Sequence, residues 1–483
     1  MQTINIVWMK KDIRLNDHAG LHAAQQANIP FLIVYLFEPE VLQRADVSLR
    51  HSQFIYHSLL DLKLNLRAQS HLLHILYGER KAIFRELFQQ FHVDTIFSYR
   101  ESGTESTWNL DKEVGTLFKQ TGVNWKEFQR DAIQRGIKNR KGWDKHWYTV
   151  MHKDVQLYEP KTIQRINFEH SFFLPSDFKA DLEAYPSLYQ PAGERMAWKY
   201  LKDFMDGRCK GYSRYISKPS ESRTSCSRLS VYITYGNISV RQVYQYVKQH
   251  PNFNKYKFPI KSFLSRLKWQ NHFIQKFEVQ CDYEYRFLNP AYEEMSYKHT
   301  PKWILAWAEG KTGVPMIDAS MRCLKATGWI NFRMRAMLVS FLTHHLDQDW
   351  RNGAFILANY FLDFEPGIHY PQVQMQAGTT GVHTLRIYNP IKQGKEHDPK
   401  GIFVRKWIPE LQNVPDNYIH EPWQMTEMEM LMLNFDLKRD YYAPIVNVEQ
   451  AAGEAREKLW AFKKRPKVNK YKGSILEKHT RKK

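Results

Sequence analysis

The first 130 residues alternate between two kinds of pattern, and this alternation constrains the fold more than any other feature. Short apolar runs rich in Val, Ile and aromatic residues are separated by stretches whose apolar residues recur every three or four positions. Such an order predicts parallel strands joined by right-handed helical crossovers. We therefore predict a doubly wound, five-stranded parallel sheet with strands at 4–8, 31–37, 72–77, 95–99 and 123–128. The helical stretches between them lie at 19–27, 49–68, 80–91 and 106–120.

A sheet of this kind binds ligands beyond the carboxyl ends of its strands. The loop that follows the first predicted strand reads MKKDIRLND, at residues 9–17. It contains no G-x-G-x-x-G, the glycine pattern that lets a backbone approach the pyrophosphate of a dinucleotide. The dinucleotide fingerprint is therefore absent from the α/β region 1–130.

The remaining sequence divides into three further regions. Residues 131–192 are rich in Pro, Ser and aromatic residues without a clean period, and we interpret them as a connector between domains. Residues 193–462 show helical periodicity almost throughout, which predicts an all-α domain. Residues 463–483 form a basic tail, and a solvated, disordered end is its simplest interpretation.

Composition excludes several classes of protein. Apolar residues make up 43% of the 483 residues, but no apolar run reaches the length of a transmembrane helix. The first residues lack the apolar centre and cleavage site of a signal peptide, so we expect a cytoplasmic protein. The four cysteines show no zinc spacing, and we expect no metal site.

The charge points to a polyanionic partner. Lys and Arg exceed Asp and Glu by 20, which favours nucleic acid first and an anionic membrane second. Aromatic residues make up 14% of the chain, and basic grooves lined with aromatic rings suit exposed bases.

One segment of the helical region carries charge in an apolar setting. Residues 327–342 read TGWINFRMRAMLVSFL, and Arg335 shares its helical face with aliphatic residues. A buried guanidinium needs an anion, and Asp363 and Glu365 lie in a similarly apolar stretch. Either the chain contains a buried ion pair of structural value, or the pair borders a bound cofactor.

Two other segments suggest ligand contacts. Residues 222–247 begin with several Ser and Thr before a helix, a composition that suits phosphate binding as well as ordinary helix capping. Residues 265–278 place Arg266 and Trp269 one turn apart on one helix. Trp269 is expected either in the core or on a stacking surface.

The adjacent histidines His344 and His345 are the last candidates. Neighbouring residues on a helix point in different directions, so they cannot face one site together. We interpret them as surface or partly buried residues.

Several long motifs resemble the photolyase/cryptochrome flavoproteins in order and spacing. They are VWMKKDIRLND, SRLS with YGNISVR, EGKTGVPMIDASMRCLKATGWINFRMR, DWRNG, FLDFEPG and RIYNPIKQGKEHDPKGIFVRKWIPEL. The resemblance runs from residue 4 to about residue 425. It implies an antenna chromophore (a folate, a deazaflavin or a flavin) in the α/β domain and FAD in the helical domain.

The resemblance also implies which residues bind FAD. Arg335 and Asp363 match the ion pair beside the flavin ring, and residues 227–230 match the loop on the FAD phosphates, with Cys226 where a Thr is usual. Gln270 replaces an Arg that contacts FAD, and His369 replaces the Asn that faces the flavin. The full set implied for FAD is Tyr212 (or Tyr215 in its place), Ser227, Arg228, Leu229, Ser230, Gln270, Arg333, Arg335, Asp363, Glu365 and His369.

For catalysis and DNA the resemblance implies a smaller set. Trp269 matches the Trp on which a flipped lesion stacks, and Arg386 matches a DNA-facing position. Arg266 stands where dimer-repairing relatives carry a Glu, and we expect it to contact the lesion. His369 is the expected proton carrier, and Trp350 matches the middle residue of the chain that delivers electrons to FAD; its neighbours fall at Val373 and Tyr297.

The activity implied is that of a deoxyribodipyrimidine photo-lyase, a carbon-carbon lyase. Blue light excites reduced FAD, which passes one electron to a pyrimidine dimer in UV-damaged DNA. We expect a monomer acting on DNA, with the type of lesion left open. The alternatives are a cryptochrome-type photoreceptor without repair activity and a basic flavoprotein that binds nucleic acid without photochemistry.

Overall fold

The N-terminal region of this computed structural model contains the predicted sheet; the structure describes residues 1–67, 72–159 and 166–479. Its strands are β1 (Thr3–Met9), β2 (Phe31–Phe37), β3 (Leu73–Tyr77), β4 (His92–Tyr99) and β5 (Asn124–Phe128). All neighbours pair in parallel in the order β3-β2-β1-β4-β5. The prediction of a five-stranded, doubly wound parallel sheet is confirmed.

Helices cover both faces of the sheet. The crossovers are α1 (Ala19–Gln26), α3 (Leu49–Arg67), α4 (Arg80–Gln90) and α5 (Glu105–Gln120), while α2 (Pro39–Leu42) is a single turn. Side chains alternate along β1: Ile6 and Trp8 pack on one side of the sheet, and Val7 and Met9 pack on the other. Burial on both faces explains why the strands read as almost continuous apolar runs. Residue 68, the predicted end of α3, lies outside the described part.

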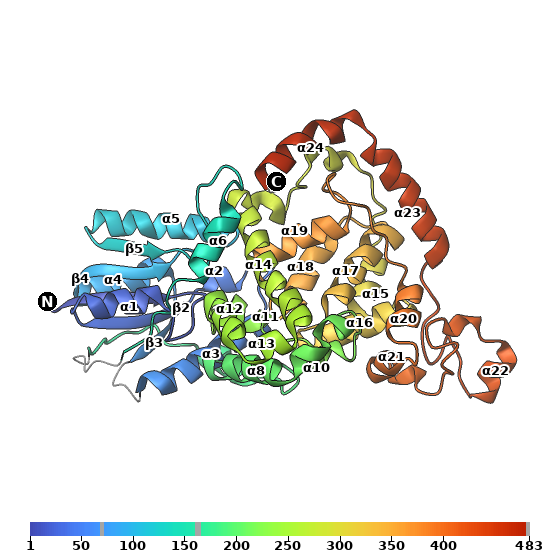
Figure 1. The fold of residues 1–483 in the computed structure, drawn as a ribbon, viewed down its shortest axis with the longest axis horizontal. Helices are drawn as coiled ribbons and strands as arrows, with labels where there is room; N and C mark the ends of the chain where they lie inside the picture. The colour runs from blue at the N-terminus through green and yellow to red at the C-terminus, as the bar shows by residue number, and fades with distance from the viewer. Residues whose placement is uncertain (68–71, 160–165, 480–483) are drawn as a thin grey trace.

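Beyond the sheet the described chain is helical, and Figure 1 shows this helical domain beside the sheet. Its α-helices are α6 (Trp143–Met151), α7 (Ser176–Glu183), α8 (Glu194–Asp206), α9 (Tyr212–Tyr215), α10 (Ser222–Ser225), α11 (Ser230–Thr234), α12 (Val240–Gln249), α13 (Asn252–Lys255), α14 (Lys257–Val279), α15 (Pro301–Glu309), α16 (Pro315–Thr327), α17 (Phe332–Ser340), α18 (Arg351–Tyr360), α19 (Pro366–Gln376), α20 (Pro390–His397), α21 (Ile402–Trp407), α22 (Glu427–Met432), α23 (Val448–Lys463) and α24 (Pro466–His479). Short 3-10 turns are η1 (Arg208–Gly211), η2 (Cys281–Glu284), η3 (Pro290–Glu294), η5 (Pro409–Leu411) and η6 (Pro422–Gln424), and η4 (Phe341–His345) is a π-helix. None of these helices is both long enough and apolar enough to cross a membrane.

The helical domain has two hydrophobic cores. One is built around Trp307 and Trp350, and the other contains Trp143 and Trp147 of α6 together with residues of α8, α11 and α12. Helix α6 of the predicted connector therefore packs into the helical domain. Helices α14 and α19 approach closely, because a Cβ at Gly367 would lie 2.8 Å from the Cα of Ile274. This close pair supports the site described below.

The basic tail forms a helix as far as residue 479. In Figure 1, α23 and α24 run along the edge of the helical domain. Val468, Ile475 and His479 of α24 are buried, although lysines surround them in the sequence. The expectation of a solvated, disordered end is wrong for this part, because three well-spaced residues are enough to anchor one face of the helix. Residues 480–483 lie outside the described residues.

Candidate functional site

Arg335 and Asp363 form an ion pair in the helical domain. Arg335 lies in the first turn of α17, which begins where the Asn331 side chain accepts a hydrogen bond from the Met334 amide at 2.9 Å. Asp363 lies in the turn between α18 and α19. The Arg335 Nη2 donates to the Asp363 Oδ2 at 2.9 Å, and its Nε donates to the Ile330 carbonyl at 3.0 Å. The predicted contact between the guanidinium and this carboxylate is present.

The hydrogen bonding of this pair is incomplete. The Asp363 side chain is 3% exposed, and its Oδ1 has no hydrogen-bond partner within the described residues. A buried carboxylate oxygen without a donor is costly. One face of the Arg335 guanidinium lies 4.1 Å from the centre of the Phe361 ring, while a quarter of the side chain remains exposed. The pair is therefore suited to receive a donor from a ligand.

The serine-rich loop lies next to this pair. Thr234, at the end of α11, donates from its hydroxyl to the main-chain carbonyl of Asp363 at 3.5 Å. Ser227 is buried and accepts a hydrogen bond from the Leu229 amide at 3.4 Å, whereas Ser230 is exposed. Arg228 adopts a left-handed backbone conformation with φ of 59°. The loop 227–230 therefore leads into a short helix whose last residue contacts Asp363, and Asp363 lies near enough to affect the pKa of Arg228.

Two arginines share one tryptophan beside this loop. The guanidinium carbons of Arg228 and Arg223 lie 4.0 and 5.7 Å from the Trp329 ring centre. Burial and the neighbouring charge of Arg223 lower the pKa of Arg228 to about 10, and its buried Nε has no hydrogen-bond partner within the described residues. An anion such as a pyrophosphate would offset the repulsion between these two cations and accept from the unmet donor. The sequence predicted Arg228 but not Arg223 or Trp329.

Helix α14 contributes the exposed aromatic residue. Trp269 is 46% exposed and contacts His272 and Phe273 with ring centres 5.8 Å away. This settles the alternatives in favour of a surface position. Arg266, one turn earlier, is also exposed, and it lies near enough to the buried Tyr212 to oppose the rise in the pKa of this phenol that burial causes. The structure therefore brings two more predicted site residues close together.

Other predicted FAD residues have partners within the chain. Glu365 is buried and pairs with Arg130 at 3.2 Å, and Arg130 also donates to the carbonyls of Ile233 and Thr234 in α11. The sequence analysis did not predict Arg130. Arg333 donates to Gln393 at 3.0 Å, although its buried Nε has no partner within the described residues. The Gln270 side chain accepts from Asn271 at 2.8 Å.

The histidines are more deeply buried than expected. The Nε2 of His369 lies 2.9 Å from the Ala354 carbonyl, and burial lowers the pKa of His369 to about 4. A neutral ring fixed on a carbonyl does not favour the predicted proton-carrying role. His344 and His345 are each 3% exposed, so their interpretation as surface or partly buried residues is wrong. Both also line one pocket, so the expectation that they cannot face one site together is wrong as well. The helix widens into η4 at this point, which turns both rings inward.

The predicted electron-transfer position is a core residue. Trp350 is fully buried, and its ring meets Phe287 edge-on at 5.8 Å. Its buried Nε1 has no partner within the described residues. Val373 is buried as well, and Tyr297 is half-buried. Arg386 is exposed in the segment before α20, as a DNA-facing residue must be.

Comparisons with known proteins agree with this geometry. Residues 5–156 match the family model of DNA photolyase, and residues 263–461 match the model of the FAD binding domain of DNA photolyase. A deoxyribodipyrimidine photo-lyase of Alkalihalophilus pseudofirmus is 28% identical over 92% of this chain and 95% of its own length. Cryptochrome DASH of Synechocystis is 26% identical over 94% of this chain and 97% of its own length.

A solved structure agrees in three dimensions. The crystal structure of a bacterial class III photolyase from Agrobacterium tumefaciens matches with a TM-score of 0.84 and 25% identity, covering 96% of this chain and 98% of that one. Both regions of the fold and the FAD-binding region are thus accounted for by one family. The chain belongs to the photolyase/cryptochrome flavoprotein family.

Proposed function

We propose that this chain is an FAD-dependent DNA photolyase that uses blue light to repair UV-induced pyrimidine dimers. The proposal rests on two buried polar groups that lie near each other and lack hydrogen-bond partners within the described residues. An open oxygen of Asp363 lies beside Arg335, and an open Nε of Arg228 lies in the adjacent loop. Together they suit a ligand with a hydrogen-bonding ring at one end and phosphates at the other.

The chain's own residues would hold FAD by charge and by hydrogen bonds. Arg223 and Arg228 would neutralise the pyrophosphate, helped by the hydroxyl of Ser225, which is buried without a partner within the described residues. Arg335 and Asp363 would orient the ring, because a fixed ion pair offers both a donor and an acceptor. When bound and reduced, FAD supplies the light-excited electron that splits the dimer. The protein must also place the damaged DNA next to this ring.

Three features suit damaged DNA. Trp269 offers an exposed aromatic face, and stacking on such a face is worth about 1–3 kcal/mol per base. Arg266 and Arg386 are exposed cations for phosphate or base contacts. The net charge of +20 favours binding to the DNA backbone and makes it sensitive to salt. A dimer pairs poorly in the duplex and is therefore cheaper to flip out than an intact base pair.

A photoreceptor without repair activity is the second candidate. Arg266 and Gln270 occupy positions where dimer-repairing relatives carry a Glu and an Arg, and a cryptochrome DASH is among the relatives. The two candidates share the cofactor and differ only in what happens to a bound lesion. A monomeric, cytoplasmic protein and a second, antenna chromophore stay predictions.

The deciding experiment illuminates the purified FAD-loaded protein with two oligonucleotides, one with a cyclobutane dimer and one with a (6-4) product. Restored bases are measured by chromatography, with a dark sample as control. Light-dependent restoration of either substrate supports repair and names the lesion. Tight binding without restoration of either would replace the photolyase assignment by the photoreceptor.

A further inference from the structure

The segment after α17 is irregular in two ways. Residues Phe341–His345 form the π-helix η4, and Asp347 follows with a positive φ of 52°. Single π-turns inside helices and non-glycine residues in left-handed conformations are both concentrated at functional sites. None of the residues assigned above to FAD or DNA lies in this segment, so the irregularity needs a separate explanation.

His345 is a buried side chain with unmet hydrogen bonds. It is 3% exposed and stacks on Phe341 at a ring-centre distance of 5.1 Å. Neither ring nitrogen makes a hydrogen bond of normal geometry within the described residues, although the Ser340 carbonyl lies nearby. Burial lowers the pKa of His345 to about 4, so the ring is neutral and presents one donor and one acceptor.

His344 adds an acceptor with a fixed orientation. Its Nε2 lies 3.0 Å from the Gln376 carbonyl, which can only accept, so this nitrogen carries the proton. Burial lowers the pKa of His344 to about 3, and the neutral ring therefore keeps its Nδ1 as an acceptor. Together the two histidines offer two acceptors and one donor.

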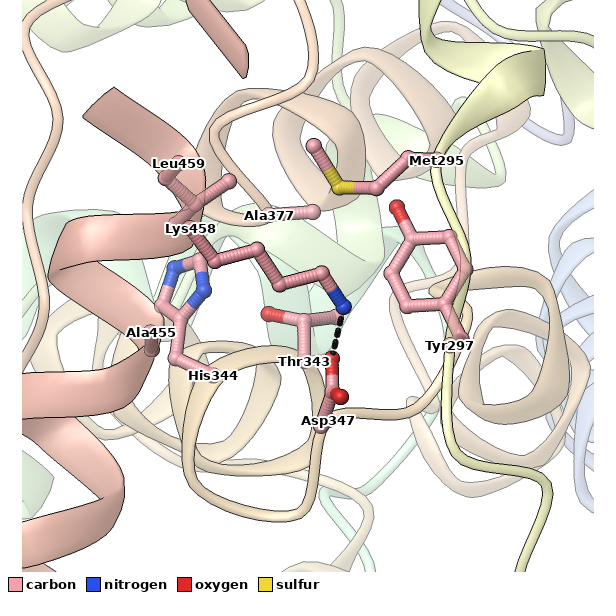
Figure 2. Close-up of a pocket in the computed structure, with 9 residues that line it drawn as sticks. All are labelled: Met295, Tyr297, Thr343, His344, Asp347, Ala377, Ala455, Lys458 and Leu459. Atoms are coloured by element: carbon pink, nitrogen blue, oxygen red, sulfur yellow. Dashed lines mark hydrogen bonds and ion pairs between the residues drawn. The ribbon is translucent and has the colours of Figure 1, made fainter. Parts of the chain in front are cut away.

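Both histidines line a cavity of about 400 Å³ between η4, α15 and α23. This volume lies in the range of small-molecule sites. Trp303 and the apolar residues Ile445 and Val446 contribute to its wall. A second, much smaller space of about 10 Å³ adjoins it and shares His344, Asp347, Ala455 and Lys458. Figure 2 shows Lys458 reaching across this space from α23 to Asp347, between His344 and Tyr297.

The charges around the cavity are already paired. Lys458 bonds to Asp347 at 2.5 Å, and Lys298 lies 3.8 Å from Glu454 at the rim. With two cations and two anions the lining carries no net charge, and nothing in it calls for a charged ligand. The indole of Trp303 favours a flat ring, and the histidines favour an edge with hydrogen-bond donors beside an acceptor.

We propose that this cavity binds an uncharged, planar heteroaromatic compound through η4 and α23, as a second ligand site of the helical domain. The ring would stack on Trp303 and present its polar edge to His344 and His345. A purine nucleoside and a flavin ring both carry such an edge, and the test below distinguishes them. The site is independent of the proposed repair activity.

The test titrates adenosine and, separately, riboflavin into the FAD-loaded protein by calorimetry, with inorganic phosphate as a third arm. We expect one of the two rings to bind with Kd below about 1 mM and phosphate not to bind. Ala451→Trp fills the cavity from α23 and is expected to weaken binding by about tenfold or more. Glu457→Trp, at an exposed position of the same helix, is the matched control and should bind like the wild type.

Repair activity is measured on the same samples and should be unchanged in both variants, so a failure here is separate from a failure of the proposed function. Binding of neither ring, or equal binding by Ala451→Trp and the wild type, would overturn the proposal. Displacement of the bound ring by phosphate would also overturn it.

A second variant separates a ligand role of His345 from a structural one. His345→Leu removes both unmet nitrogens at similar volume. We expect weaker binding of the ring, by about three- to tenfold, and an unchanged or higher Tm. A fall in Tm together with unchanged binding would mean that the imidazole supports the fold only, and the proposal would be rejected.

Discussion

The α/β domain and the helical domain each contain a cluster of buried charge, and the two clusters are completed by partners within the chain to different degrees. In the α/β domain, Lys10 and Arg80 both bond to Asp111, at 2.8 and 2.6 Å, and Arg80 also bonds to Glu38 at 2.8 Å. Both cations also lie over the Trp8 ring, at 4.2 and 4.8 Å. This network follows the ends of β1 and β2, and each of its charges is met by an opposite charge within the chain.

In the helical domain the cluster around Arg335 and Arg228 is incomplete. Asp363 is met by Arg335 at one oxygen only, and the guanidinium of Arg228 lies beside Arg223 with an unmet Nε. A closed network fixes a fold, whereas an open one leaves a polar group ready for a ligand. We infer from this difference that the buried groups without partners beside Arg335 and Arg223 belong to a ligand site, whereas the network around Asp111 supports the fold.

The largest expected effect is a loss of thermal stability when the network of Lys10, Arg80 and Asp111 is broken. Asp111→Ala leaves Lys10 and Arg80 without their shared anion, and breaking a buried pair costs about 3–5 kcal/mol. We expect a clearly lower Tm with normal FAD content per folded molecule, measured by thermal unfolding and flavin absorbance. Loss of FAD at unchanged Tm would contradict the contrast between the two networks.

The second expected effect is a loss of FAD affinity when the Arg335–Asp363 pair is broken. Asp363→Ala removes the acceptor for the ring and the partner of Arg335, and hydrogen bonds to charged groups contribute about 1.5–3 kcal/mol. FAD affinity should fall by about 10- to 100-fold, while the Tm of the FAD-free protein changes less than in Asp111→Ala. Titration of FAD into both proteins measures this. The matched control is Asp440→Ala, which removes a carboxylate that is 29% exposed and bonded to Arg439, and it should leave FAD affinity unchanged.

A smaller effect is expected at the exposed aromatic residue. Trp269→Ala removes a stacking surface worth about 1–3 kcal/mol, so affinity for dimer-containing DNA should fall about tenfold. Affinity for undamaged DNA and its dependence on salt should stay the same, because phosphate contacts are untouched. Exposed Trp460→Ala on α23 is the control. Equal weakening for damaged and undamaged DNA would show that Trp269 does not read the lesion.

The smallest effect concerns pH and Lys276 on α14. Lys276 is 7% exposed, and burial, with the charge of Arg140, lowers the pKa of Lys276 to about 8. The unfolded chain therefore binds the proton more tightly, and this residue's contribution to stability becomes more favourable as pH rises from about 8 toward the ordinary value of 10.5. Lys276→Met should raise Tm at pH 7, and the gain should shrink toward pH 10. A gain that is constant with pH would contradict this origin.

Local patterns in the sequence predicted more of the fold than of the site. The strands and crossovers could be predicted because period and burial are encoded within each element. The Arg335–Asp363 contact could be predicted because one charge on an apolar face needs a partner. The Arg130–Glu365 and Arg223–Trp329 contacts could not, since they join segments far apart in the chain. The inward turn of the two histidines depends on η4, which a regular 3.6-residue period does not predict.

The central claim is that FAD supplies the hydrogen-bond partners that the Asp363 Oδ1 and the Arg228 Nε lack. The most direct measurement is a crystal structure of the FAD-loaded protein. We predict that the Asp363 Oδ1 accepts a hydrogen bond from the flavin ring and that the Arg228 Nε lies within hydrogen-bonding distance of an FAD phosphate. FAD bound elsewhere, with both atoms still lacking a partner, would contradict the account.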